Sequence, residues 1–194
     1  MHILPEIEVV VIGGSAGSLT VIMNILRSLE VYFTLPIIIV IHRQKNVISE
    51  LTKILGLSSK FKKIIEPDDK ELVSDCCIYI APQNYHLLVE DDRSFSLDYS
   101  EAVQYSRPSI DVTFESVSKI YKNKCAAILL SGANNDGTEG LQSVVEAGGT
   151  AIVQNPDTAD YPIMPQSALQ AIEEVVSMKP QEISDYLNNL CIRK

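Results

Sequence analysis

Apolar residues follow two alternating patterns along the chain. Short β-branched and apolar runs predict strands that are covered on both faces, at Glu8–Ile12, Pro36–Ile41, Ala126–Leu130 and Thr150–Val153. Apolar residues at helical spacing predict helices at Leu19–Leu29, Ile48–Leu55, Pro108–Tyr121, Thr138–Ala147 and Pro165–Val176. Strands that alternate with helices imply βαβ crossovers. We therefore expect an α/β fold with a doubly wound, mainly parallel sheet and helices on both faces, a Rossmann-like three-layer sandwich.

The middle of the chain has a different pattern, in which short strand-like runs are separated only by turn residues. They lie at Cys76–Ile80, Tyr85–Val89 and Ser94–Tyr99, and they predict a small antiparallel meander at one edge of the main sheet. The 194 residues fit one domain, 1–194. Because the first predicted strand begins at Glu8, we expect no receiver domain before it.

Composition and charge exclude several classes of function. Sixteen Lys and Arg against 25 Asp and Glu give a net charge of −9, which disfavours a nucleic-acid partner. The sequence shows neither a signal peptide nor an apolar run long enough to span a bilayer, so we expect a cytoplasmic protein without membrane insertion. None of the four cysteines forms a C-x-x-C pair. We expect them to be reduced and buried, and we expect no metal and no cofactor.

The end of the first predicted strand carries a candidate nucleophile. Gly13-Gly14-Ser15-Ala16-Gly17 has the form G-x-S-x-G, in which a sharp strand-to-helix turn exposes the serine hydroxyl and backbone N–H groups can stabilise an oxyanion. A glycine-rich turn with a helix-capping serine is the plainer alternative. A dinucleotide fingerprint does not fit, because it requires glycine at Ser15 and Ser18 and an acidic residue where His42 stands.

Two further strand ends carry a candidate base and acid. His42 ends the second predicted strand and can take a proton from Ser15, whereas His86, in the predicted meander, is its only serious competitor. Asp136 follows the third strand and can orient the histidine, or it can simply cap the next helix. Because carboxyl ends of parallel strands share one edge of a sheet, these three positions together favour a Ser-His-Asp triad.

The chain resembles the catalytic domain of CheB-type chemotaxis protein-glutamate methylesterases from Val9 to about Val176. The resemblance rests on a series of motifs in the family's order: Ile12-Gly13-Gly14-Ser15-Ala16-Gly17, Ile41-His42, Tyr79-Ile80-Ala81-Pro82 with Tyr85-His86, Arg107-Pro108-Ser109-Ile110-Asp111-Val112, Leu130-Ser131-Gly132-Ala133-Asn134-Asn135-Asp136-Gly137, and Ile163-Met164-Pro165. It implies hydrolysis of glutamyl methyl esters on the cytoplasmic domain of methylated chemotaxis receptors to glutamate and methanol. Glutamine deamidation at the same receptor positions occurs in some members.

The resemblance also implies residue roles: Ser15 as nucleophile, His42 as general base and acid, and Asp136 as orienting acid. This chain has Ala16 where the family usually has Thr, Ala133 where it usually has Met, and Ser18 where a third glycine is expected. Ala16 and Ala133 are expected near the oxyanion. Arg107 is expected at the entry to a helix, or alternatively along the substrate cleft or a regulatory interface.

Two other functions remain open at this point. The same fold without activity would serve as an adaptor that binds a receptor, and the two alanines motivate this alternative. An esterase acting on a small ester outside chemotaxis is the other. Many family members carry a phospho-accepting receiver domain in the same chain; without one, a phosphorelay regulator would act in trans.

Overall fold

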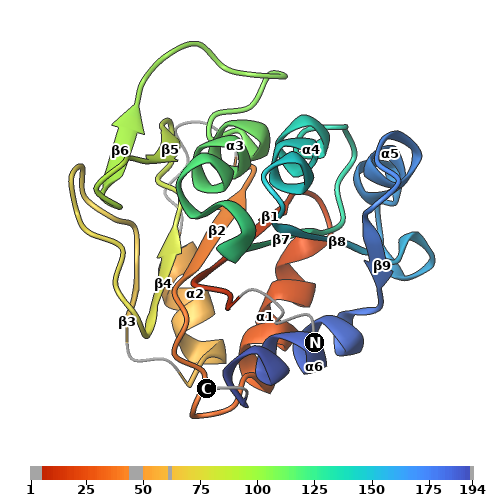
Figure 1. Ribbon diagram of the computed structural model, residues 1–194, viewed down its shortest axis with the longest axis horizontal. Coiled ribbons are helices and arrows are strands. Elements are labelled where there is room, and N and C mark those ends of the chain that lie inside the picture. The colour runs from red at the N-terminus through yellow and green to blue at the C-terminus, as the bar shows by residue number, and fades with distance from the viewer. Residues whose placement is uncertain (1–5, 44–49, 61–62, 193–194) are drawn as a thin grey trace.

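The protein, represented by a computed structural model that describes residues 6–43, 50–60 and 63–192, is built on a parallel β-sheet (Figure 1). In the described part of the chain this sheet has seven strands in the order β3-β4-β2-β1-β7-β8-β9, and each pair of neighbours is parallel. The strands are β1 (Val9–Gly14), β2 (Ile37–Ile41), β3 (Lys63–Ile65), β4 (Cys77–Ile80), β7 (Cys125–Leu129), β8 (Thr150–Gln154) and β9 (Val176–Met178). A separate antiparallel pair consists of β5 (His86–Val89) and β6 (Phe95–Asp98).

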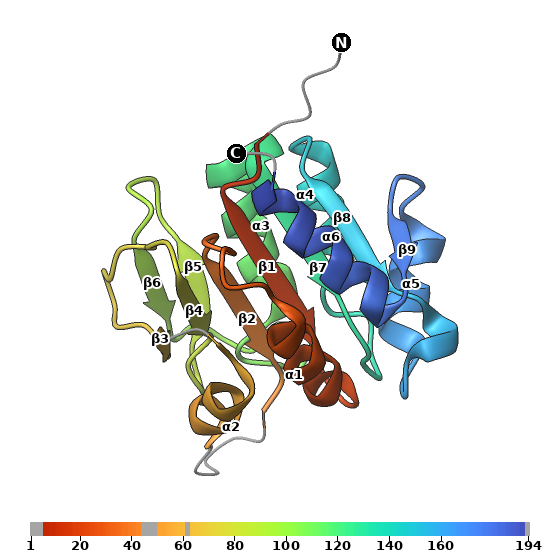
Figure 2. The ribbon, with the colours of Figure 1, turned by 90° about the horizontal axis from the view of Figure 1, so that it is seen from below.

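Helices cover both faces of the sheet, as Figures 1 and 2 show. One face carries α1 (Ser18–Ser28), α2 (Leu51–Ser58) and α6 (Pro180–Ile192). The other carries α3 (Ile110–Tyr121), α4 (Thr138–Glu146) and α5 (Ile163–Ala171). Short 3-10 turns occur at Lys122–Lys124 and Pro156–Thr158. The predicted doubly wound three-layer fold is confirmed, while residues 48 and 49 of the predicted second helix lie outside the described residues.

Alternation along the strands creates two hydrophobic cores. In β1, Val9 and Val11 face the core beneath α3, α4 and α5, whereas Val10 and Ile12 face the core beneath α1, α2 and α6. All four side chains are fully buried. Burying an aliphatic side chain of this size contributes about 1.5–3 kcal/mol. A strand that is apolar at every position is therefore held from both sides, which fixes the position of its carboxyl end.

Several local predictions were wrong. The run predicted as the first strand of the meander is β4, which lies inside the main sheet between β3 and β2 and leaves only β5 and β6 as the antiparallel pair. The predicted helix Pro165–Val176 ends early, and its last residue begins the edge strand β9. Cys77 and Cys125 are buried, and all four cysteines are free, but Cys76 is exposed and Cys191 is half-buried.

The order of the strands places a topological switch point between β1 and β7. The connection through α1 leads from β1 to β2 on one side, whereas α4 leads from β7 to β8 on the other. Side chains at such a point line a crevice beyond the carboxyl ends of the strands, where open α/β sheets bind ligands. Ser15 follows β1, and Asp136 lies in the connection that follows β7.

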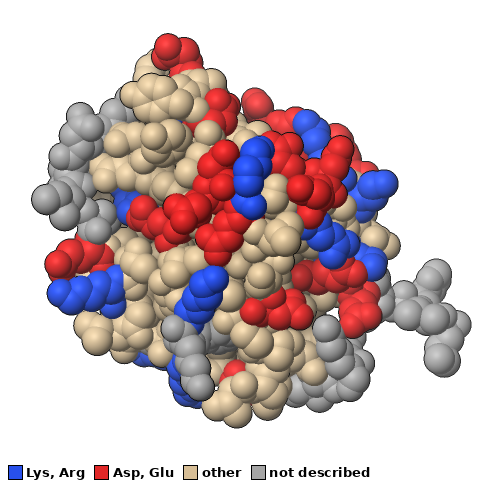
Figure 3. All heavy atoms as spheres, turned by 90° about the vertical axis from the view of Figure 1, so that its left-hand side faces the viewer, with Lys and Arg blue, Asp and Glu red and all other residues tan. Residues whose placement is uncertain are grey.

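The surface carries a concentration of carboxylates over the edge formed by β3, β5 and β6 (Figure 3). Exposed acidic residues that follow β3 or join β5 to β6 include Asp68, Asp69, Glu90, Asp91 and Asp92. Such a face repels phosphate backbones and offers nucleic acid no binding platform. Within the residues that the structure describes, no helix is both long enough and apolar enough to cross a bilayer.

Candidate active site

Ser15 lies in a tight turn between β1 and α1, and its neighbours leave little freedom for the backbone. Gly17, the N-cap of α1, has φ of 79°, a conformation that favours glycine, and a Cβ there would lie 2.7 Å from Ser131 Oγ. Ser18, in place of the glycine expected from the family, is fully buried and donates from Oγ to the Ser15 carbonyl oxygen at 2.7 Å. The serine turn is therefore fixed by its own sequence.

The turn is also joined to the segment that follows β7. The Ser15 N–H donates to the carbonyl oxygen of Ser131 at 2.9 Å, and Ser131 Oγ donates to the Ala16 carbonyl oxygen at 2.8 Å. Ser131 is itself buried, and its N–H donates to Gln154 Oε1 at 3.0 Å. In the sequence, Ser131 stands within the Leu130–Gly137 motif, and nothing in the pattern indicates its role. Its hydroxyl connects the two strand ends that flank the switch point.

His42 follows β2 directly and lies beside the serine turn. Gly14 pairs with Ile41 in the β1–β2 register, and the His42 N–H continues the ladder by donating to the Gly14 carbonyl oxygen at 3.2 Å. Ser15 and His42 thus follow neighbouring strands, whose spacing is about 4.8 Å. His42 Nε2 lies 2.7 Å from Asp136 Oδ2, with side chains that are 13% and 0% exposed. The structure brings the predicted base and acid into contact.

Four hydrogen bonds fix the carboxylate of Asp136. Besides His42, it accepts the N–H of Ile110 on Oδ2 at 2.9 Å, and on Oδ1 it accepts Ser109 Oγ at 2.9 Å and the N–H of Asp111 at 3.0 Å. Burial raises the pKa of Asp136, but the bond from His42 and the two backbone donors outweigh burial and hold its pKa below the ordinary 3.8. The carboxylate is therefore ionised, and His42 donates to it through Nε2–H.

The second nitrogen of His42 has an unexpected neighbour. Ser106 Oγ lies 3.4 Å from Nδ1, whereas no hydrogen bond joins the hydroxyl of Ser15 to His42 in the described residues. Ser106 ends a tight turn, with Val103 and Ser106 bridged by two backbone hydrogen bonds of 3.1 and 2.8 Å. A contact of 3.4 Å is weak, and catalytic hydrogen bonds commonly tighten only when substrate binds.

The other predicted site residues lie around this centre in different roles. Ala16 and Ala133 are exposed, and their backbone N–H groups donate to no acceptor in the part of the chain that the structure describes. Arg107 instead bonds the carbonyl oxygens of Tyr99 and Ser100 and stacks over the Tyr99 ring at 3.9 Å. Its guanidinium group holds the helix entry against the segment that follows β6.

His86, the competing histidine, is fully buried, and its two ring nitrogens bond residues other than Ser15. Its Nδ1 accepts the N–H of Ser109 at 3.1 Å, and its Nε2 donates to the Glu101 carbonyl oxygen at 3.0 Å. Both ring nitrogens are therefore engaged by the backbone, which makes His86 a structural residue behind the site.

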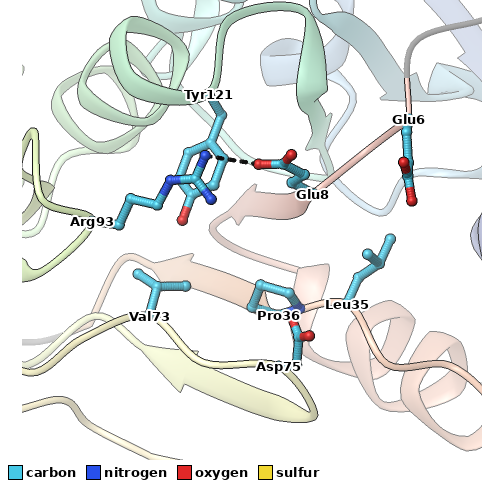
Figure 4. Close-up of a pocket in the computed structure, with 8 residues that line it drawn as sticks. All are labelled: Glu6, Glu8, Leu35, Pro36, Val73, Asp75, Arg93 and Tyr121. Atoms are coloured by element: carbon cyan, nitrogen blue, oxygen red, sulfur yellow. Dashed lines mark ion pairs between the residues drawn. The ribbon is translucent and has the colours of Figure 1, made fainter.

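A pocket of about 250 Å³ lies at the opposite end of the sheet (Figure 4). Its lining includes Glu8 and Pro36, which precede β1 and β2, and an ion pair of 2.9 Å joins Glu8 to Arg93 across it. Because it lies at the amino ends of the strands, it has no part in the chemistry of Ser15. No group of three His, Cys, Asp or Glu side chains among residues 6–43, 50–60 and 63–192 is arranged to hold a metal ion.

Ser15 and Asp136 flank the switch point of the parallel sheet, and His42 contacts Asp136 from the end of the neighbouring strand β2, an arrangement of the kind that serine hydrolases use. The family model described as CheB methylesterase matches residues 10–187. The chain therefore belongs to the CheB methylesterase family, whose members are carboxylic ester hydrolases.

Similar proteins agree with this assignment. A Leptospira interrogans protein, provisionally named protein-glutamate methylesterase/protein-glutamine glutaminase, is 42% identical over 174 residues, which are 89% of this chain and 90% of that protein. The Thermotoga maritima protein of that name is 32% identical over 84% of this chain and 48% of its own length. The crystal structure of the Thermotoga maritima CheB methylesterase catalytic domain superposes with a TM-score of 0.87 at 31% identity, covering 96% of this chain and all of that one.

Proposed function

We propose that this protein hydrolyses glutamyl methyl esters on the cytoplasmic domain of methylated chemotaxis receptors, through Ser15, His42 and Asp136. The observation that carries the proposal is the 2.7 Å contact between His42 and Asp136 at the strand end beside Ser15. A buried carboxylate on one imidazole nitrogen leaves the other as the proton acceptor, which is what a serine nucleophile requires. The names of the similar proteins supply the substrate class.

The reaction begins with proton transfer from Ser15 Oγ to His42 Nδ1 while Oγ attacks the ester carbonyl carbon. The oxyanion that forms accepts hydrogen bonds from the N–H groups of Ala16 and Ala133, both free of protein acceptors in the described residues. The intermediate collapses as His42 protonates the departing methoxide, and methanol leaves an acyl-enzyme. Water, deprotonated by His42, then releases the glutamyl carboxylate and restores Ser15.

In this reaction the Ser106 hydroxyl has to move away from His42 Nδ1. Its hydroxyl faces the same His42 nitrogen that accepts the proton of Ser15, at a distance of 3.4 Å. A contact this long stabilises the imidazole weakly, so a substrate that draws Ser15 toward Nδ1 displaces it readily. The turn from Val103 to Ser106 carries Tyr105, whose side chain is 98% exposed.

A glutamine substrate would follow the same route with a different leaving group. Attack by Ser15 on the side-chain amide gives the same acyl-enzyme, and ammonia leaves instead of methanol. The similar proteins carry both activities in their names. We expect the reaction to take place in the cytoplasm, within a single domain 1–194, with a phosphorelay regulator acting in trans if one is used.

Methanol release tests the function directly. Receptor carrying radiolabelled methyl esters is incubated with the protein, and volatile label is measured against time with Ser15→Ala as the blank. We expect label to appear as methanol at a rate proportional to the enzyme concentration. No release at any concentration would favour a receptor-binding adaptor. Hydrolysis of small activated esters without release from the receptor would instead indicate an esterase that acts outside chemotaxis.

A further inference from the structure

Two aspartates at the candidate site cap each other's helices. Asp136, just before α4, accepts the backbone N–H groups of Ile110 and Asp111 in the first turn of α3. Asp111, in that same turn, accepts on Oδ1 the backbone N–H groups of Gly137 at 2.8 Å and Gly140 at 2.7 Å, where α4 begins. Each helix thus supplies the carboxylate that satisfies the free N–H groups of the other.

This mutual capping holds the two helix starts very close together. A Cβ at Gly140 would lie 2.8 Å from the backbone of Asp111, and Gly137 has φ of 94°. Gly137 is also the N-cap of α4 and has no side chain of its own with which to cap the helix. The carboxylate of Asp111 takes the place of that missing side chain.

Asp111 is unusual because it is almost fully buried and forms no ion pair with a basic side chain among the residues that the structure describes. Its exposed fraction is 6%, and the charged group beside it is another carboxylate, Asp136. Burial and the neighbouring charge of Asp136 raise the pKa of Asp111 to about 7, against the lowering effect of the N–H groups of Gly140 and Gly137. Placing two carboxylates together in the interior costs stability, and such costs are typical of functional sites.

Polar side chains complete the arrangement around the pair. Ser109, the N-cap of α3, donates to Asp136 and is itself held by His86, while Gln104 Nε2 donates to Asp111 Oδ2 at 3.0 Å. Gln104 belongs to the turn that also places Ser106 against His42. Contacts from Asp111 therefore reach the segments on both sides of the imidazole.

We propose that Asp111 is a positioning residue for the His42–Asp136 pair: by capping α4 it fixes the direction in which the Asp136 carboxylate points. This inference rests on the proposed triad. Without the carboxylate of Asp111, the N–H groups of Gly137 and Gly140 lose their acceptor, and the loop that carries Asp136 relaxes. A displacement of about 1 Å at a catalytic group can cost about a hundredfold in rate.

Three substitutions at one position separate geometry from charge. Asp111→Asn keeps Oδ1 as the acceptor of both backbone N–H groups, and Gln104 can turn its amide to accept from the new NH2. Asp111→Glu keeps the charge but displaces it by a methylene. Asp111→Ala removes both the charge and the acceptor of the two N–H groups. Per folded molecule, we expect kcat on methylated receptor to fall roughly 10- to 100-fold in the Ala and Glu variants, with KM within about threefold. The Asn variant should recover most of kcat.

A spectroscopic readout makes the test independent of turnover. The Nε2–H proton of His42, bonded to Asp136, should give a downfield NMR signal in the wild type and in Asp111→Asn, and should weaken or move in Asp111→Ala and Asp111→Glu. Glu115→Gln, an exposed carboxylate in the same helix, is the matched control and should change neither kcat nor the signal.

The outcomes distinguish this inference from the proposed function. If Asp111→Ala and Asp111→Glu lose thermal stability but keep the wild-type kcat per folded molecule and an unchanged His42 signal, Asp111 only holds the fold and the inference is overturned. Loss of kcat in Asp111→Asn equal to that in Asp111→Ala would also overturn it. If the wild type releases no methanol, the proposed function fails, and the His42 signal still decides whether Asp111 positions the pair. Should the Ala variant not fold, the Glu and Asn variants carry the same comparison.

Discussion

Replacing Ser15 with alanine is expected to lower kcat for ester hydrolysis by roughly four to six orders of magnitude. The substitution removes the atom that forms the acyl-enzyme, and no step of the proposed reaction proceeds without it. The substitution should disturb the structure little, because Ser15 is held through backbone contacts to Ser131 and Ser18 rather than through its own hydroxyl. Thermal stability should therefore match the wild type, and the assay is methanol release at saturating receptor concentration.

Ser106→Ala is the matched control, because both serines lie near the same imidazole nitrogen. Ser106 lies in the Val103–Ser106 turn and, unlike Ser15, does not follow a strand of the parallel sheet. Its removal should leave kcat within about threefold of the wild type, since the contact it makes with Nδ1 is long. A loss of several orders of magnitude in Ser106→Ala, with Ser15→Ala still active, would reverse the assignment of the nucleophile.

Asp136→Asn is expected to lower kcat by about ten-thousandfold, the magnitude seen when the orienting acid of a serine triad is neutralised. An amide in place of the carboxylate presents NH2 or an uncharged oxygen to His42 Nε2. It either favours the wrong tautomer, with Nδ1 protonated and unable to accept from Ser15, or fails to stabilise the imidazolium that forms. KM should change little, because Asp136 is fully buried and cannot touch the substrate.

The pH dependence of this carboxylate has a defined sign. The pKa of Asp136 is held below its ordinary value of 3.8, so the stability that its ionised form contributes is present above the unfolded pKa. That contribution is lost only as pH falls through the lower folded pKa. Protonation of Asp136 therefore cannot account for a loss of activity near pH 6.

The prediction for Asp136→Asn is checked by measuring its kcat between pH 6 and 9, with the exposed Asp157→Asn as control. Retention of a tenth of the wild-type kcat would contradict the role assigned to Asp136.

The sequence predicted which strand ends lie side by side, because their arrangement follows from the topology of the sheet. Apolar runs such as Val9–Gly14 and Ile37–Ile41 cannot be surface strands, and parallel strands bring their carboxyl ends to one edge. Ser15 and His42 directly follow two such runs. Their adjacency needed only the correct assignment of two strands and of their direction.

The arrangement around Asp136 could not be predicted in the same way. It depends on the starts of α3 and α4 lying side by side, and the sequence separates Asp111 from Gly137 by a helix and a strand. The motif that contains Ser109 and Asp111 was visible, but its partners were not. The contact of Ser106 with His42 depends on a surface turn whose direction no hydrophobic pattern records.

The wrong prediction for β4, which was expected in the meander, has a related cause. Cys77–Ile80 and His86–Val89 are both short apolar runs between turns, and nothing local distinguishes a strand of the main sheet from a strand of a hairpin. Parallel pairing with β2, in which Ile37 lies opposite Ile78, places β4 in the main sheet. The edge strand β3 has three residues of mixed character, and in the described sheet its one neighbour is β4.

Covalent trapping shows which serine His42 activates as the nucleophile. The protein is incubated with a fluorophosphonate, which forms a stable phosphonyl ester with a serine activated by a neighbouring base, and the modified residue is located by peptide mass spectrometry. We expect one adduct, on Ser15, that forms in step with the loss of methanol release and slows strongly in His42→Ala. An adduct on Ser106, or full inactivation with Ser15 unmodified, would contradict it.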